Sequence, residues 1–180
     1  MENNYHIIKT QLPNGSILKQ VALDCDYIDS YETTINTNKK LTTTDIAIAF
    51  HKSSADRPKW IRRLMKIRNA ITSLFGLKDT QIDNTAINDQ TFEIGKKLGM
   101  FEIFDRLDNE LILGKNDKHL NFRISALTDN NQVSNETKLT LSTVVKYNNF
   151  FGKLYFIPVK PFHKLIVPVM LKGIAKHLQT

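Results

Sequence analysis

The chain has 180 residues, 41% of them hydrophobic and 24% charged, with a formal net charge of +7 and one cysteine. This composition is typical of a globular domain with one substantial core, and it excludes a disordered or collagen-like chain. Because Cys25 is alone, no intrachain disulfide can form. The first residues lack the basic and apolar regions of a secretory signal, so we expect a cytoplasmic protein.

The positive charge permits a nucleic-acid or anionic-membrane partner. The lysines and arginines are spread along the chain rather than gathered in one block, which argues against nucleic acid. The longest apolar run, Leu165–Leu171, ends at Lys172 and falls short of the roughly 20 residues that span a bilayer. We therefore expect no transmembrane segment.

The N-terminal 23 residues are poorly defined by pattern. Ile7 and Ile8 allow a short strand, Pro13-Asn14-Gly15 is a turn signal, and Ser16–Leu23 allows a short helix. The first clear strand covers Asp26–Asn36, which is rich in aromatic and β-branched residues.

Two helices are expected after this strand. Thr42–Asp45 offers an N-cap for a short helix that ends near Lys52. A second helix is predicted over Pro58–Phe75, with basic side chains along one face, and Lys78–Gln90 follows as a loop. The basic residues of that face are Lys59, Arg62, Arg63 and Lys66.

The pattern then changes to a period of two residues, which predicts antiparallel strands. Asp108-Asn109 forms a tight turn between the first two strands, and Asp129–Glu136 is a possible flexible insert. The predicted strands are Leu98–Leu107, Glu110–Gly114, Lys118–Thr128, Thr137–Tyr147 and Gly152–Val159.

The last element is a strongly apolar helix over Pro161–Leu178. Val167, Leu171 and Leu178 widen its apolar face, so we expect the helix to be covered on most of its circumference. The residues of that face at helical spacing are Phe162, Leu165, Ile166, Val169, Met170 and Ile174. A curved sheet and one apolar helix must bury their faces against each other, so the order of elements predicts an α+β domain over residues 1–180. This is the helix-grip arrangement, in which the sheet wraps around the C-terminal helix.

Several segments resemble a bacterial family of uncharacterised domains in the START-like, birch-pollen-allergen-like superfamily (SRPBCC). They are Pro58–Trp60, Leu64–Arg68, Leu113–Ser125, Gly152–Tyr155 and Pro161–Ile166. The resemblance covers roughly Asp26 to the C-terminus. It implies a deep cavity between sheet and helix that holds hydrophobic molecules. Members also occur fused to Rossmann-type nucleotide-binding domains, and such a partner would have to be a separate protein here.

Polar residues on the third strand of this meander are the catalytic candidates. Alternation places His119 and Arg123 on one face and Leu120, Phe122 and Ile124 on the other. If the apolar set faces the helix, the polar set lies on the outside of the sheet. If the polar set lines the cavity, Asp117 could orient His119 as a general acid or base, and Arg123 could hold an anionic oxygen. The sequence leaves both alternatives open.

The candidate ligand-binding residues come from several elements. Each also has a structural interpretation, as a packing anchor, a core tyrosine or a locally paired first-turn residue. The five histidines show no metal-ligand spacing, and no glycine-rich phosphate loop is present, so neither a metal nor a cofactor is expected. The candidates are Trp60, Arg123, Tyr147, Tyr155, His163 and Ile166.

Three functions are compatible with these observations. The first is binding of a small hydrophobic or amphipathic molecule between the sheet and the final helix, in a monomer or a homodimer. The second is a small cyclase, hydratase or lyase that uses Asp117, His119 and Arg123. The third is an interaction through the basic face of the second helix, weakened by salt because it is electrostatic.

Overall fold

A computed structural model describes residues 5–55, 58–61, 63–64, 92–131 and 135–179. Its centre is a curved antiparallel sheet of seven strands in the order β1-β2-β7-β6-β5-β4-β3. The elements are β1 (Ile8–Thr10), α1 (Leu18–Ala22), β2 (Tyr27–Asn36), α2 (Thr43–Ala55), β3 (Lys97–Leu98), β4 (Phe101–Arg106), β5 (Glu110–Asn116), β6 (Leu120–Asn131), β7 (Glu136–Tyr147) and α4 (Phe150–Leu178). The α+β class predicted from the sequence is confirmed.

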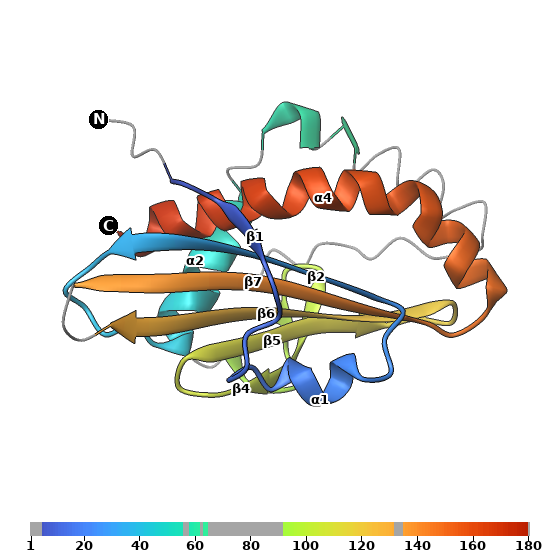
Figure 1. The fold of residues 1–180 in the computed structure, drawn as a ribbon, viewed down its shortest axis with the longest axis horizontal. Helices are drawn as coiled ribbons and strands as arrows, with labels where there is room; N and C mark the ends of the chain where they lie inside the picture. The colour runs from blue at the N-terminus through green and yellow to red at the C-terminus, as the bar shows by residue number, and fades with distance from the viewer. Residues whose placement is uncertain (1–4, 56–57, 62, 65–91, 132–134, 180) are drawn as a thin grey trace.

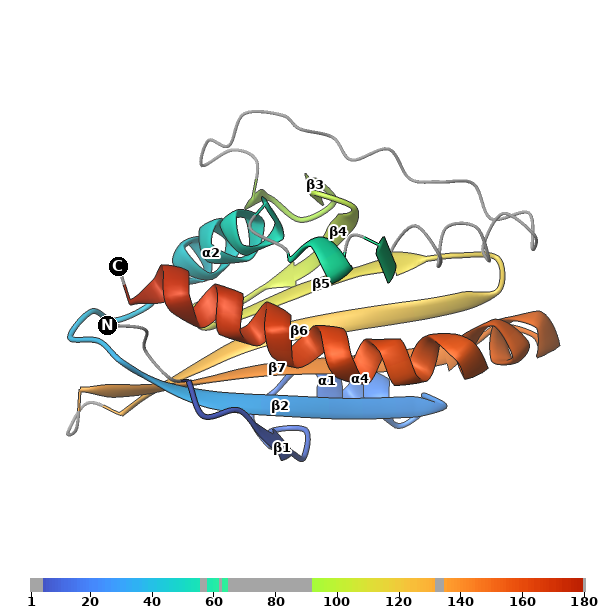
Figure 2. The same ribbon diagram turned by 90° about the horizontal axis from the view of Figure 1, so that it is seen from above.

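The helices lie on both sides of the sheet. α4 and α2 cover one face, which we call the inner face, and α1 lies against the outer face (Figure 1). α4 runs lengthwise over the strands and ends beside α2 (Figure 2). It packs against β2, β7 and α2. The main core therefore lies between α4 and the sheet.

Strand alternation decides which side chains reach this core. Ile124 and Ala126 of β6 and Leu139 and Leu141 of β7 are buried in one apolar cluster with residues of α4. The intervening residues face outward, where Val144 packs with α1 in a smaller cluster. Both faces of the central strands are thus covered.

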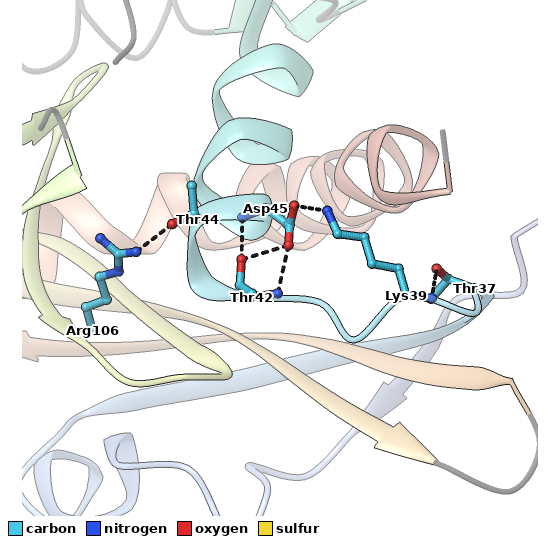
Figure 3. Close-up of polar contacts among 6 residues, drawn as sticks. All are labelled: Thr37, Lys39, Thr42, Thr44, Asp45 and Arg106. Carbon is cyan, nitrogen blue, oxygen red and sulfur yellow. Dashed lines mark hydrogen bonds and ion pairs between the residues drawn. The ribbon is translucent and has the colours of Figure 1, made fainter. Parts of the chain in front are cut away.

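A capping box starts α2 where the sequence predicts it. The Thr42 hydroxyl and backbone N–H both donate to Asp45 Oδ2, over 2.7 and 2.9 Å, and the Asp45 N–H donates back to the Thr42 hydroxyl. Lys39 Nζ lies 2.5 Å from Asp45 Oδ1. Figure 3 shows this network and the bond from the Arg106 guanidinium to the Thr44 hydroxyl, which fastens the helix to β4.

Asn149 is the N-cap of α4 and also binds the turn between β5 and β6. The Asn149 side-chain oxygen accepts from the Gly152 N–H over 3.1 Å, and its amide donates to the Lys118 carbonyl over 3.1 Å. The Asn148 N–H donates to the His119 carbonyl over 2.8 Å. The first turn of the helix is therefore held against the β5–β6 turn, at the end of the central strands.

The predicted strand Gly152–Val159 is wrong, because these residues form the first turns of α4. Their aromatic and β-branched content favours a strand locally, but the Asn149 cap and the burial of Tyr155 and Phe156 stabilise a helix. The helix contains three prolines. Pro158 and Pro161 lie on its exposed side, where water can bond the carbonyl groups that lose a donor.

The predicted buried face of the final helix is confirmed only in part, because Ile174 is buried and Ile166, Val169 and Met170 are partly buried. Phe162 and Leu165 are exposed, and the buried residues lie one or two positions further on in the helical repeat. α4 is apolar around most of its circumference, so spacing alone does not select the face that meets the sheet. The buried residues of this half are Val167, Leu171, Ile174, Ala175 and Leu178.

Of the remaining predictions, one strand is divided in two, two features are confirmed, and two lie largely or wholly outside the described residues. The strand predicted over Leu98–Leu107 is divided into β3 and β4 by a turn at Gly99, whose φ of 65° favours glycine. The short helix in Ser16–Leu23 and the turn at Asp108-Asn109 are confirmed. Most of the predicted second helix and all of the predicted loop Lys78–Gln90 lie outside the described residues.

The capping box predicts a stability that depends on pH. Partial burial raises the pKa of Asp45, but bonds from Lys39 and Thr42 lower it more, so its pKa lies below the ordinary 3.8. The folded state therefore gains stability above pH 3.8 and loses it as the pH falls through the lowered pKa. Asp45→Asn should cost about 0.5–1 kcal/mol at neutral pH. Urea unfolding measures this cost.

The difference between Asp45→Asn and the wild type should shrink as the pH falls below 3.8 and through the lowered pKa, because the carboxylate then becomes protonated. Exposed Asp24 provides a control, and Asp24→Asn should leave the free energy of unfolding unchanged. A difference that stays constant down to low pH would contradict the charge-assisted cap.

The close approach at the start of α4 predicts a large effect of one methyl group. A Cβ at Gly152 would collide with the carbonyl oxygen of His119 and lie 2.8 Å from its carbonyl carbon. Gly152→Ala should lower the free energy of unfolding by about 1–3 kcal/mol, because backbone must move. Gly15→Ala, where nothing lies within 4 Å of the new Cβ, should change it by less than about 0.5 kcal/mol. Equal effects would contradict the packing.

Candidate functional site

Strand β2 brings an acid into the inner face of the sheet. Tyr27, Asp29 and Tyr31 alternate along the strand toward α4, and all three are buried. Tyr27 and Tyr31 belong to apolar clusters that contact α4, so Asp29 lies between two hydrophobic side chains. A carboxylate in this position needs hydrogen-bonding partners.

Helix α4 supplies one partner from the middle of its buried stripe. Steps of four residues lead from Val159 through His163 and Val167 to Leu171 along this side of the helix. His163 Nε2 lies 3.2 Å from Asp29 Oδ1, and the side chains are 18% and 2% exposed. The stripe thus places an ionisable group where a helix of this kind ordinarily carries an apolar one.

The second partner comes from the same strand as the acid. The Tyr27 hydroxyl donates to Asp29 Oδ2 over 2.6 Å, and the Tyr27 ring meets the His163 ring edge-on with centroids 5.9 Å apart. Lys160 Nζ lies 5.2 Å from the Tyr27 ring centroid. Both carboxylate oxygens of Asp29 therefore have a partner, His163 of α4 at Oδ1 and Tyr27 of the same strand at Oδ2.

Thr143 stands directly opposite Asp29 in the register of β2 and β7. Residues that face each other in this way project to the same side of the sheet. Thr143 is 2% exposed, and the described part of the chain offers its hydroxyl no hydrogen-bond partner. A buried hydroxyl without a partner costs free energy, and such an atom in a native fold requires an explanation.

Tyr27, Asp29, Thr143 and His163 form what we call the polar layer. It separates two apolar clusters of the inner face. One contains Val167, Leu171 and most of the core, and the other lies toward the start of α4. The second cluster consists of Tyr27, Leu120, Val145, Tyr155 and Phe156, with Phe122, Tyr147 and Val159 packed against it.

Electrostatics in the layer favour neutral tyrosines. Burial raises the pKa of Tyr27, and the hydrogen bond to Asp29 and the negative charge of Asp29 raise it further. Burial also raises the pKa of Tyr31, again with a contribution from Asp29. The Tyr27 hydroxyl therefore keeps its proton and acts as a hydrogen-bond donor to the acid.

The three catalytic candidates lie elsewhere and have separate partners. Leu120 and Ile124 face α4, so Arg123 lies on the outer face, with its guanidinium carbon 3.4 Å from the Phe104 ring centroid. Arg123 also donates to the Asn116 side chain over 2.8 Å. Burial lowers the pKa of Arg123.

Asp117 and His119 belong to the turn that anchors α4. Asp117 lies 3.9 Å from Lys115 Nζ, and its carboxylate accepts from the backbone N–H of His119 over 3.5 Å. The His119 ring faces the Asn149 side-chain oxygen, with Nδ1 3.2 Å away. The alternative left open by strand alternation is thus resolved in favour of the outer face for Arg123 and the turn for His119.

The candidate ligand-binding residues are divided between the interior and the surface. His163 lies in the polar layer, and Tyr155 and Tyr147 lie in the adjoining cluster, where the Tyr147 and Phe156 ring centroids are 5.5 Å apart. Ile166 is half-buried on the flank of α4, and Trp60 is 41% exposed. The structure brings the first three together.

Sequence reasoning missed Asp29 and Thr143. The signal for Asp29 was an acid at an inward position of an otherwise apolar alternation, Tyr27-x-Asp29-x-Tyr31. Thr143 gave no signal, because threonine is common in strands and its lack of a partner is a property of the packing. In the described part of the chain, no group of three His, Cys, Asp or Glu residues is arranged to hold a metal ion.

The fold and the polar layer define the class of protein. It is an α+β domain with a seven-strand antiparallel sheet, a long C-terminal helix and an ionisable pair buried between them. The chain belongs to the family described as a protein of unknown function (DUF2867), whose profile matches residues 21–170. A search of curated proteins found no match.

The unpartnered hydroxyl predicts a stabilising substitution. Thr143→Val keeps the shape of the side chain and removes a buried group that has no hydrogen bond. The free energy of unfolding should rise by about 1 kcal/mol. Thr137 on the same strand is equally buried, but its hydroxyl donates to the Asn130 side chain over 3.0 Å. Thr137→Val should therefore be destabilising, and a similar loss at both positions would contradict the assignment.

Proposed function

We propose that the protein binds a small amphipathic molecule between the first half of α4 and the inner face of the sheet. The observation that carries the proposal is the Thr143 hydroxyl, buried and unpartnered beside the bonded pair of Asp29 and His163. A hydroxyl or carbonyl group of the bound molecule supplies the missing hydrogen bond. Its apolar part lies against Tyr147, Phe156 and their neighbours.

The two halves of α4 have different packing partners. The C-terminal half of α4 packs on α2, where Gly173 allows a close approach to Ser53. The first half instead meets the sheet through aromatic rings that are tilted rather than stacked, as Tyr27 and Phe156 are at 58°. The aromatic side chains of the first half offer the kind of surface on which the apolar part of a small molecule packs.

The arrangement supports a more specific fold assignment. We propose that the curved sheet and α4 form the helix-grip fold of the START-like superfamily, with the bound molecule between the sheet and the helix. The support is the antiparallel strand order and the passage of α4 along the inner face (Figure 2). A hydrophobic ligand and a bacterial source would fit this assignment.

A second candidate function is a small lyase, hydratase or cyclase. It is favoured by the chain of Tyr27, Asp29 and His163, in which the Asp29 carboxylate contacts Nε2 of the His163 imidazole and so orients the ring. An imidazole held in this way by a carboxylate is positioned to take up or give up a proton. In this form the enzyme would use the polar layer rather than Asp117, His119 and Arg123.

Native mass spectrometry of the gently purified protein tests the binding proposal. The expected spectrum shows a stoichiometric adduct that organic extraction releases and identifies. His163→Ala should lower the retained fraction at least tenfold, because Asp29 loses its partner and the layer reorganises. His51→Ala, on α2 away from the layer, should retain the adduct.

A clean unliganded mass, together with no binding of the amphipathic probe anilinonaphthalene sulfonate to the folded protein, would overturn the proposal. Retention of the adduct by a folded His163→Ala variant would show that the molecule binds elsewhere. Conversion of the extracted molecule on incubation with wild-type protein, abolished in His163→Ala, would favour the enzymatic function.

A further inference from the structure

The outward side of α4's first half is apolar. Phe150, Ile157 and Leu165 are 71%, 63% and 58% exposed, and Leu154 and Phe162 are also exposed. Steps of three, four and eight residues connect Phe150, Leu154, Ile157 and Leu165, so they share one side of the helix. That side lies opposite the buried stripe of His163 and Val167. We call these four residues the outer stripe.

An outer stripe of this kind is unusual on a protein surface. Exposed apolar residues are ordinarily scattered, whereas a continuous row on one helix indicates an interaction surface. By length and composition α4 is apolar enough to cross a membrane. Its buried stripe, however, is packed against the sheet along both halves, so the helix presents only its outer side to a partner.

The charges of α4 indicate the nature of that partner. Phe150–Leu178 contains five lysines, two histidines and no aspartate or glutamate. Lys153, Lys160 and Lys164 are exposed and are separated by seven and four residues, which places them in a row along one edge of the outer stripe. Lys118 is exposed on the turn beside the helix N-terminus.

We propose that the first half of α4 docks on the surface of an anionic lipid bilayer. The outer stripe enters the boundary between headgroups and acyl chains, and the lysine row contacts the negative headgroups. A second copy of this chain fits the surface less well. A symmetric pair of these faces would bring lysine rows together with no acidic residue of the helix to neutralise them.

Vesicle co-sedimentation tests this proposal. Wild-type protein should sediment with vesicles of equal parts phosphatidylcholine and phosphatidylserine, and much less with phosphatidylcholine alone. Added salt should release it. Ile157→Gln with Leu165→Gln should weaken binding at least tenfold, because less apolar area enters the bilayer. Lys153→Gln with Lys164→Gln should weaken it about twenty-five-fold, at about fivefold for each lysine near the surface.

The matched controls lie on other surfaces. Leu23→Gln removes a side chain that is 87% exposed next to α1, and Lys52→Gln removes an exposed lysine of α2. Both should bind like the wild type. Because every substituted residue is exposed, all variants should melt at the wild-type temperature.

Three results would overturn the proposal. One is equal binding to the neutral and anionic vesicles, or no binding to either. Another is wild-type binding by the Ile157→Gln, Leu165→Gln variant. The last is light scattering that shows a dimer which this variant converts to a monomer, since the outer stripe would then be covered by a second copy.

Discussion

The packing of α4 across the inner face of the sheet is the contact on which the rest of the structure depends. The inner residues of β2, β6 and β7 are apolar over most of their length, and α4, together with α2, removes them from water. The cap at Asn149 and the close approach of Gly152 to His119 fix where that helix begins. The approach of Gly173 to Ser53 fixes its C-terminal half against α2.

This contact contains a polar layer that the packing alone does not need. Replacing a buried polar pair by apolar residues of similar volume is often neutral or stabilising, because burying polar groups costs desolvation free energy. Apolar packing therefore gives no reason for Asp29 and His163 to meet here, and Thr143 adds an unpartnered hydroxyl. Groups of this kind at the centre of an apolar interface are what a site for an amphipathic molecule requires. The outer stripe gives the opposite side of the same helix the separate role that we propose at a lipid surface.

The sequence predicted those features that depend on local pattern. Alternation identified β2, β6 and β7, and the capping residues Thr42 and Asp45 identified the start of α2. The start of α4 was predicted too late, because Leu154–Ile157 favours a strand and Pro161 resembles a first helical residue. Helical spacing fits both Phe162, Leu165 and Val169 and the true buried set, since the helix is apolar on two sides. Only the sheet beneath α4 decides between them.

The polar layer was only partly predictable for a related reason. His163 was a candidate because it lies at the start of the predicted final helix, where its ring could point toward the cavity, but its partner Asp29 is 134 residues away. Asp117, His119 and Arg123 are close in the chain and looked like a site, yet strand alternation directs Arg123 to the outer face. Residues that are close in the sequence therefore proved to belong to a turn and the outer face. The residues of the polar layer are distant in the sequence and meet only in the folded protein.

A crystal structure of the protein with the molecule it retains on purification tests this account most directly. The account predicts non-protein density between α4 and the sheet, with a polar atom within hydrogen-bond distance of Thr143 Oγ1 and apolar density continuing toward Phe156. A closed interface would contradict it, with Thr143 bonded to a neighbouring protein group and no density other than protein between the helix and the strands.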